Sequence, residues 1–270
     1  MRESDRLATS LTERFGLPLG AEAFIDAGIR RYRVYPLEIA PTQGFAVEVL
    51  IGWRSVEARF VPGSFATSLV TAMQSATSQQ RAVFRAFAHA IAADGATLSF
   101  CVNGKAIDPL TELGWPLHWR SIALRLERTP IEAVSSDPQA SRSLAETWGG
   151  RMLGLALALL PVEAELASEV EGGAVHGQST RHERSSLNRA ACIELHGARC
   201  KVCHLDFSER YGPIGHGFIE VHHLEPVSQI PSGTPIDPAK DLVPLCPNCH
   251  SMAHRREPPL GVQELRDLLR

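Results

Sequence analysis

The sequence predicts an α+β protein in three parts: an N-terminal α+β domain with an antiparallel sheet, a helical linker, and a C-terminal domain stapled by metal. Helical and strand-like patterns alternate in the first part, with turn residues between them. The last part, from about residue 200 to 260, contains nine prolines that break up any long element. So loop-rich a segment cannot easily form its own core, and it holds two C-x2-C pairs, so a structural metal is expected.

The composition is that of a globular protein without a membrane span. The chain has 270 residues, 44% of them hydrophobic and 21% charged, which leaves room for two ordinary cores. No run of about 18 apolar residues exists, and the first residues alternate charged and apolar side chains, unlike a signal peptide. We therefore expect a cytoplasmic protein with no membrane partner. In that compartment the six cysteines are expected to be metal ligands or buried thiols.

The N-terminal domain, residues 1–135, is expected to begin with an amphipathic helix at about 7–15. The stretches RYRVYPLEI and GFAVEVLIGWRSVEARFVPG are rich in β-branched and aromatic residues, which favours a strand and a hairpin. Residues 64–93 show apolar spacings of three and four, and predict a helix that ends at Asp94-Gly95. Alternation returns in ATLSFCVNG and LHWRSIALRLERT, which completes an antiparallel sheet.

The linker, residues 136–180, is expected to hold a helix at about 141–160, which Pro161 stops. An acidic and then glycine-containing stretch without apolar periodicity follows, and we place the domain boundary there. A helix at about 184–196, ended by Gly197, then leads into the C-terminal domain, residues 181–270.

The net charge of −3 excludes a general affinity for polyanions, so a nucleic acid would have to contact local clusters of basic residues. Two short clusters qualify, and a solvated surface is an equally good interpretation of each. They consist of Arg30, Arg31 and Arg33 around Tyr32, and of Arg255 and Arg256 after His254.

The two C-x2-C pairs predict a structural zinc site. Two thiolates separated by two residues converge on one ion, and two such pairs complete a closed tetrahedral site for Zn²⁺. The alternative is that these cysteines are buried free thiols. The ligands would be Cys200, Cys203, Cys246 and Cys249.

His250 and His254 are then surplus to the zinc site. A Cys-Cys-His-His finger needs about twelve residues between its second cysteine and first histidine, and here there are none. Four residues apart on a short helix, the two imidazoles share a face and suit a second divalent ion. His222 and His223 lie in a strand-like stretch and point to opposite faces, so one can complete that metal site while the other meets water or substrate.

The stretches CKVCHLDF, EVHHLEPVS and DLVPLCPNCHSMAH resemble the zinc-stapled, McrA-like type of HNH endonuclease, over roughly residues 184–270. The resemblance implies a ββα-metal fold. It implies that His222, His250 and His254 bind the catalytic metal and that His223 is the general base. Asp241 stands where the family usually has the central Asn, which holds the base and its loop in position; Asp keeps the acceptor oxygens but loses the amide donor.

The implied reaction is hydrolysis of a DNA phosphodiester with Mg²⁺ or another divalent metal such as Mn²⁺, Ni²⁺ or Co²⁺. The arrangement of an N-terminal α+β domain, a linker and an HNH domain resembles type IV restriction enzymes, which cut modified double-stranded DNA. One site per chain then suggests a homodimer for double-strand cleavage. Trp53, Trp115 and Trp119 would line a pocket for a modified base, although a place in the sheet core is the favoured interpretation.

Two alternatives to this function remain. The first is an HNH nuclease of a mobile element or toxin system, in which the N-terminal domain binds a sequence or a protein. The second is a zinc module that binds DNA without cutting it. The complete set of four histidines argues against the second, because a module that only binds has no need of an open metal site.

Overall fold

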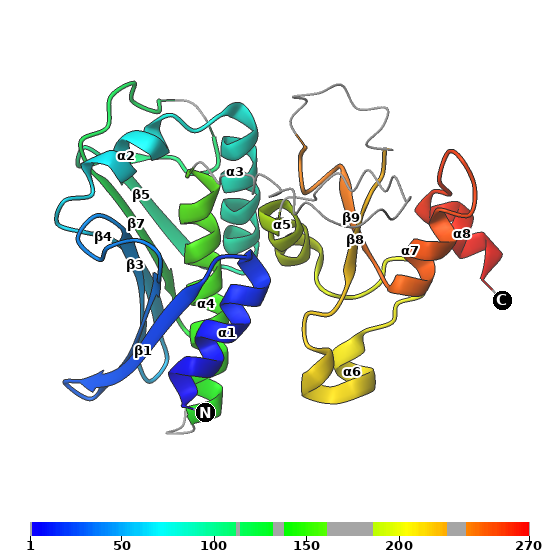
Figure 1. The fold of residues 1–270 in the computed structure, drawn as a ribbon, viewed down its shortest axis with the longest axis horizontal. Coiled ribbons are helices and arrows are strands. Elements are labelled where there is room, and N and C mark those ends of the chain that lie inside the picture. The colour runs from blue at the N-terminus through cyan, green and yellow to red at the C-terminus, as the bar shows by residue number, and fades with distance from the viewer. Residues whose placement is uncertain (1, 112–113, 132–137, 161–185, 226–235, 270) are drawn as a thin grey trace, which may run out of the picture.

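The structure is a computed structural model, and it describes residues 2–111, 114–131, 138–160, 186–225 and 236–269. A sheet is covered by helices on one face, and a smaller C-terminal part lies beside these helices (Figure 1). The acidic and glycine-containing stretch expected before residue 180 lies outside the described residues. Within the described ranges, no helix has the length and apolar character that a bilayer crossing requires.

The N-terminal sheet has seven strands in the order β1-β2-β3-β4-β7-β5-β6, and every described pair is antiparallel. Its register aligns Tyr32, Val49, Ala58 and Leu126 across four strands, and all four side chains are buried under the helices. The strands are β1 (Leu19–Asp26), β2 (Ile29–Pro36), β3 (Phe45–Ile51), β4 (Val56–Pro62), β5 (Thr97–Val102), β6 (Lys105–Ile107) and β7 (Ile122–Arg128).

The predicted α+β class with an antiparallel sheet is confirmed, with two differences in its elements. Strands β1 and β6 were not predicted, because β1 is mostly exposed and β6 has only three residues, so neither shows an apolar alternation. Residues 64–93 form two helices instead of one. The break occurs where Thr77 caps the second helix: its hydroxyl accepts from the Gln80 N–H, and the Gln80 side chain accepts from the Thr77 N–H.

The helix of the predicted linker belongs to the N-terminal core. Helix α4 packs on β3, β4 and the neighbouring helices, and every residue from Trp148 to Ala158 is buried. Gly154 is required for this packing, because a Cβ there would lie 2.5 Å from the Phe87 ring. The helices of this layer are α1 (Glu3–Phe15), α2 (Thr67–Gln74), α3 (Ser78–Ala93) and α4 (Pro138–Ala158).

The C-terminal part is built around a two-stranded antiparallel hairpin that pairs His222 with Val243 and His223 with Leu242. One helix precedes the hairpin and packs on both parts of the molecule, and another follows it directly. The elements are α5 (Ser186–His196), α6 (Phe207–Tyr211), the 3-10 turn η1 (Gly212–Gly215), β8 (Glu220–His223), β9 (Leu242–Leu245), α7 (Pro247–Ala253) and α8 (Val262–Leu268).

Candidate metal centres

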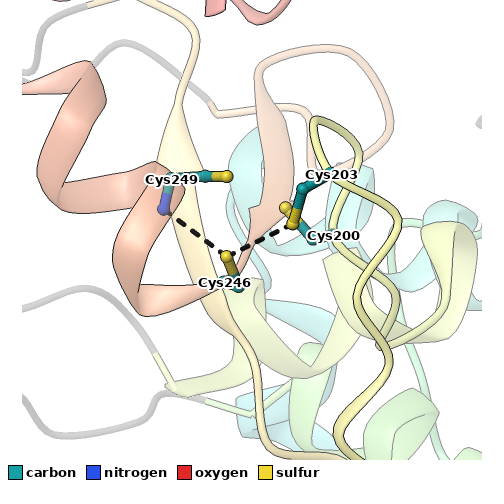
Figure 2. A group of neighbouring side chains, drawn as sticks. All are labelled: Cys200, Cys203, Cys246 and Cys249. Atoms are coloured by element: carbon teal, nitrogen blue, oxygen red, sulfur yellow. Dashed lines mark hydrogen bonds between the residues drawn. The ribbon is translucent and has the colours of Figure 1, made fainter. Parts of the chain in front are cut away.

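Four cysteines lie together at the start of α7. Their sulfur atoms are all within 4.8 Å of one another. Cys200 and Cys203 come from one turn, Cys246 follows β9, and Cys249 lies in the first turn of α7 (Figure 2). The Lys201 N–H donates to the Pro244 carbonyl at 3.0 Å, which ties the turn to β9. Cys246 is the N-cap of α7, and its sulfur accepts from the Cys249 N–H at 3.4 Å. The predicted pairs are therefore brought together, and their set fits Zn²⁺.

The electrostatics of the cysteines favour a bound cation. Burial raises the pKa of the Cys249 thiol, and the neighbouring sulfurs raise it further. Burial alone would also raise the pKa of Cys200, but backbone N–H groups around its sulfur donate to it and hold the pKa below its ordinary value. Four sulfurs this close cannot all be thiolates without a compensating positive charge, which a divalent ion supplies.

Three histidines form a second cluster. His222 of β8 and His250 and His254 of α7 each offer a ring nitrogen within 4.8 Å of the others, and their ring centroids are 4.9–5.2 Å apart. His250 and His254 share a helix face as their spacing predicts, and the Cys246 cap sets where that helix begins. Among the described residues the cluster has three nitrogen donors and no fourth ligand, and such a set leaves coordination positions open, as is typical of a catalytic site.

Glu220 is a site residue that the sequence analysis missed. Its carboxylate oxygen Oε2 contacts Nδ1 of His250. Carboxylates that accept from the second ring nitrogen of a ligand histidine fix its tautomer and orientation. Glu220 stands two residues before His222 on one strand, and both therefore lie on the strand face toward α7. The E-x-H spacing of Glu220 and His222 is the sequence pattern that could have identified Glu220 as a site residue.

His223 lies on the other face of the hairpin, by strand alternation and by its pairing with Leu242. It is not a member of either described metal cluster. His222 therefore lies on the strand face toward α7, and His223 lies on the opposite face with Val221. This geometry is compatible with the different roles that were expected for the two histidines.

Asp241 acts on the loop before β9. Its carboxylate oxygen Oδ2 accepts from the Asp237 N–H at 2.7 Å, and its backbone carbonyl accepts from the Leu224 N–H at 2.9 Å. These contacts fix the chain directly after His223. This side-chain contact uses an acceptor oxygen, which Asn also has, and it makes no use of the amide donor that Asp lacks.

The basic cluster at residues 30–33 does not form one patch. Arg30 contacts Glu3 of α1 at 3.1 Å, and Arg31 contacts Asp26 at 2.9 Å. Arg33 lies on the sheet face that no described helix covers, where the strand registers place equal numbers of arginines and glutamates. These are Arg31, Arg33, Arg59 and Arg125 with Glu22, Glu48, Glu57 and Glu127.

The other residues that were predicted to contact DNA also lie in different environments. Arg256 contacts Glu264 at 2.8 Å, and Arg255 is exposed. Trp115 and Trp119 pack with Phe100 in the core of the N-terminal part, as the favoured interpretation has it. Trp53, by contrast, is 75% exposed at the β3–β4 turn. No pocket formed by all three tryptophans exists.

The comparison with family models matches residues 200–256 to a family described as HNH endonuclease. These residues form an HNH domain. It contains the four clustered cysteines, the three clustered histidines, His223 and Glu220. The match supports, for this segment, the resemblance to the HNH family noted in the sequence. No curated protein and no solved structure matches the chain.

Replacing Glu220 with Gln is expected to weaken divalent-metal binding at the three histidines of the HNH domain. Loss of such a carboxylate partner typically lowers affinity by about 10- to 100-fold. Titration of the zinc-loaded protein with Co²⁺, followed by absorption, measures this affinity. The matched control is Glu264→Gln, which removes the charge of an exposed carboxylate that contacts Arg256 and accepts from the Gly261 N–H. Equal Co²⁺ affinity in both variants contradicts a role for Glu220 in orienting His250.

Proposed function

We propose that the protein is a metal-dependent DNA endonuclease that hydrolyses phosphodiester bonds. The observation that carries this proposal is the cluster of His222, His250 and His254 inside a segment that matches the HNH endonuclease family, with His223 next to it on the strand. A domain that only binds DNA gains nothing from a metal site with open positions. The four-cysteine cluster supports the same helix that carries two of the three ligands.

The residues of the site have separate roles in the proposed reaction. His222, His250 and His254 would hold a divalent ion, which would supply the positive charge that stabilises the scissile phosphate as negative charge develops on it. His223 takes the proton from the attacking water. Glu220 holds the ring of His250, and Asp241 holds the chain next to His223. Arg255 and Arg256 follow the last ligand and are placed to bind flanking phosphates, which guanidinium groups match in geometry.

The donor set favours particular metals. Imidazole nitrogen suits late transition metals, whereas Mg²⁺ prefers oxygen ligands and gives up its water reluctantly. We therefore expect Co²⁺ and Ni²⁺ to support cleavage better than Mg²⁺. The zinc of the four-cysteine cluster is structural in this proposal and takes no part in the chemistry.

We further propose that the N-terminal sheet domain directs the nuclease to modified DNA, as in a type IV restriction enzyme. The support is architectural: a sheet domain with its own core accompanies an HNH domain that matches only residues 200–256. Its exposed or half-exposed residues include Arg33, Trp53 and the neighbouring Arg54, which are of the kinds that contact phosphates and bases. Double-strand cleavage would require a homodimer, because the described residues contain one three-histidine cluster.

Nicking and linearisation of plasmid DNA tests the proposal. The full-length, zinc-loaded protein is incubated with matched plasmids that are unmodified, methylated, hydroxymethylated or phosphorothioated, in Mg²⁺, Mn²⁺, Co²⁺ or Ni²⁺. We expect cleavage of at least one modified plasmid, with little cleavage of the unmodified one. Equal cleavage of all plasmids refutes modification dependence and favours a mobile-element or toxin nuclease. Binding without cleavage in every metal refutes the nuclease.

A further inference from the structure

Helix α5 packs with one face on the N-terminal part and with the opposite face on the C-terminal hairpin. Leu187, Ala190 and Ala191 are buried in the same core as α3 and α4, and their spacing continues to Glu194. On the other side of the helix, Cys192 is fully buried against Val221 and Leu242 of the hairpin. The matched HNH segment begins only at residue 200, so this helix lies outside it.

The side of α5 that packs on the N-terminal part carries a buried cluster of ion pairs, the ionic clamp, which consists of Glu194, Arg14 and Arg151. Arg14 of α1 contacts the Glu194 carboxylate at 2.7 Å, and Arg151 of α4 contacts its other oxygen. The side chains of Glu194 and Arg151 are each only 9% exposed. Arg151 also stacks on Trp148 at 4.5 Å and contacts Asp94, so its position is fixed from three sides. Buried pairs of this kind are costly to leave half-made.

Gly150 of α4 leaves room for the Arg14 side chain in the clamp. A Cβ on Gly150 of α4 would lie 2.9 Å from the Arg14 guanidinium. A side chain at that position would therefore push Arg14 away from Glu194, which makes glycine the residue that leaves room for the contact.

The opposite face of α5 holds the hairpin that carries both candidate histidines. Arg189 donates to the Ile219 carbonyl at 2.9 Å, directly before Glu220. Val221 and Leu242, which pack on Cys192, are the strand neighbour of His222 and the cross-strand partner of His223. One short helix thus connects the clamp in the N-terminal layer to the strand on which the catalytic histidines lie.

We infer that Glu194 is a positioning residue for the proposed nuclease site: through α5 it locks the β8–β9 hairpin to the N-terminal layer, so that this layer is part of the active-site scaffold. The metal and base assignments used here rest on the proposed function. The N-terminal part then has a second role besides recognition. A shift of α5 would change where His222 and His223 lie relative to α7.

Full-length Glu194→Gln tests this inference, with Glu264→Gln as the matched control at an exposed ion pair. Hydrogen exchange of the hairpin amides, residues 220–223 and 242–245, should accelerate by about tenfold or more in Glu194→Gln, while amides of β2, β3 and β4 keep their protection. Co²⁺ affinity of the three-histidine site should fall, with zinc retained at the cysteines. In plasmid cleavage, kcat should fall with little change in KM.

Unchanged hairpin exchange and Co²⁺ affinity overturn the inference. If Glu194→Gln also exposes the sheet amides, the milder variant Arg14→Gln is measured, because it keeps the contact between Arg151 and Glu194. Selective loss of hairpin protection in Arg14→Gln supports the positioning role. Equal loss of protection in sheet and hairpin shows that the clamp is purely structural. Exchange and Co²⁺ binding do not depend on cleavage. A wild-type protein that cuts no DNA would therefore refute the proposed function without deciding the role of Glu194.

Discussion

Replacing Cys246 with Ser is expected to release the zinc and unfold the C-terminal part of the chain. A structural zinc contributes roughly 10–16 kcal/mol of binding free energy that is at the same time folding free energy. Among the described residues, the main core of this part has nine buried members, and three of them are cysteines of the cluster. Without the ion, the remaining apolar contacts are too few to order a proline-rich segment.

Cys246 has a second function that makes it the most sensitive of the four positions. It caps α7, and the same helix presents His250 and His254 to His222. Its loss therefore removes the catalytic metal site together with the structural one. A surface depression of about 550 Å³ is lined in part by Cys203, Cys246 and Cys249, next to the proposed zinc position. Prolonged chelation of the wild-type protein should reproduce the effect of the substitution.

Zinc content and hydrogen exchange measure this outcome together. We expect the Cys246→Ser protein to contain no zinc and to lose protection in β8, β9 and α7, while the N-terminal sheet stays protected because its core is separate. The control is Cys101→Ser, which changes a half-buried cysteine of β5 outside the cluster. A zinc-free Cys246→Ser protein with an ordered, active HNH domain would show that the cluster is not a staple.

Local spacing was sufficient to predict much of the site. The C-x2-C pairs and the four-residue spacing of His250 and His254 are set by short stretches of backbone, so their consequences can be read without the fold. The contact between Glu220 and His250 could not be predicted in this way, because thirty residues separate the two and only the hairpin and α7 together bring them into contact.

The arrangement of the helices was also beyond the sequence patterns. Helix α4 looked like a connector because it lies next to an acidic stretch, yet its small and apolar residues on all sides mark it as buried. Helix α5 was expected to serve only the C-terminal domain. Its use of both faces depends on Arg14 and Arg151, which lie far from it in sequence, and nothing in the local pattern of residues 186–196 indicates those partners.

His223→Ala is expected to abolish most DNA cleavage without loss of metal. A positioned general base contributes about 10²- to 10⁴-fold to the rate, and cleavage should fall by that factor. His223 is outside the three-histidine cluster and on the other face of the strand, so Co²⁺ affinity and zinc content should stay at wild-type values. His222→Ala should differ in this respect, because it removes a clustered ring nitrogen and should lower Co²⁺ affinity as well as the rate.

Comparison of His222→Ala with His223→Ala separates the metal-binding role expected for His222 from the base role expected for His223. The control is His216→Ala, an exposed histidine of the same domain, which should cut DNA normally. Free imidazole added to His223→Ala should restore part of the activity without a change in Co²⁺ affinity if the missing group is a base. Loss of Co²⁺ affinity in His223→Ala, or equal cleavage by His223→Ala and wild type, would contradict the assignment. The strand alternation that places His222 toward α7 and His223 toward Val221 would then have no catalytic meaning.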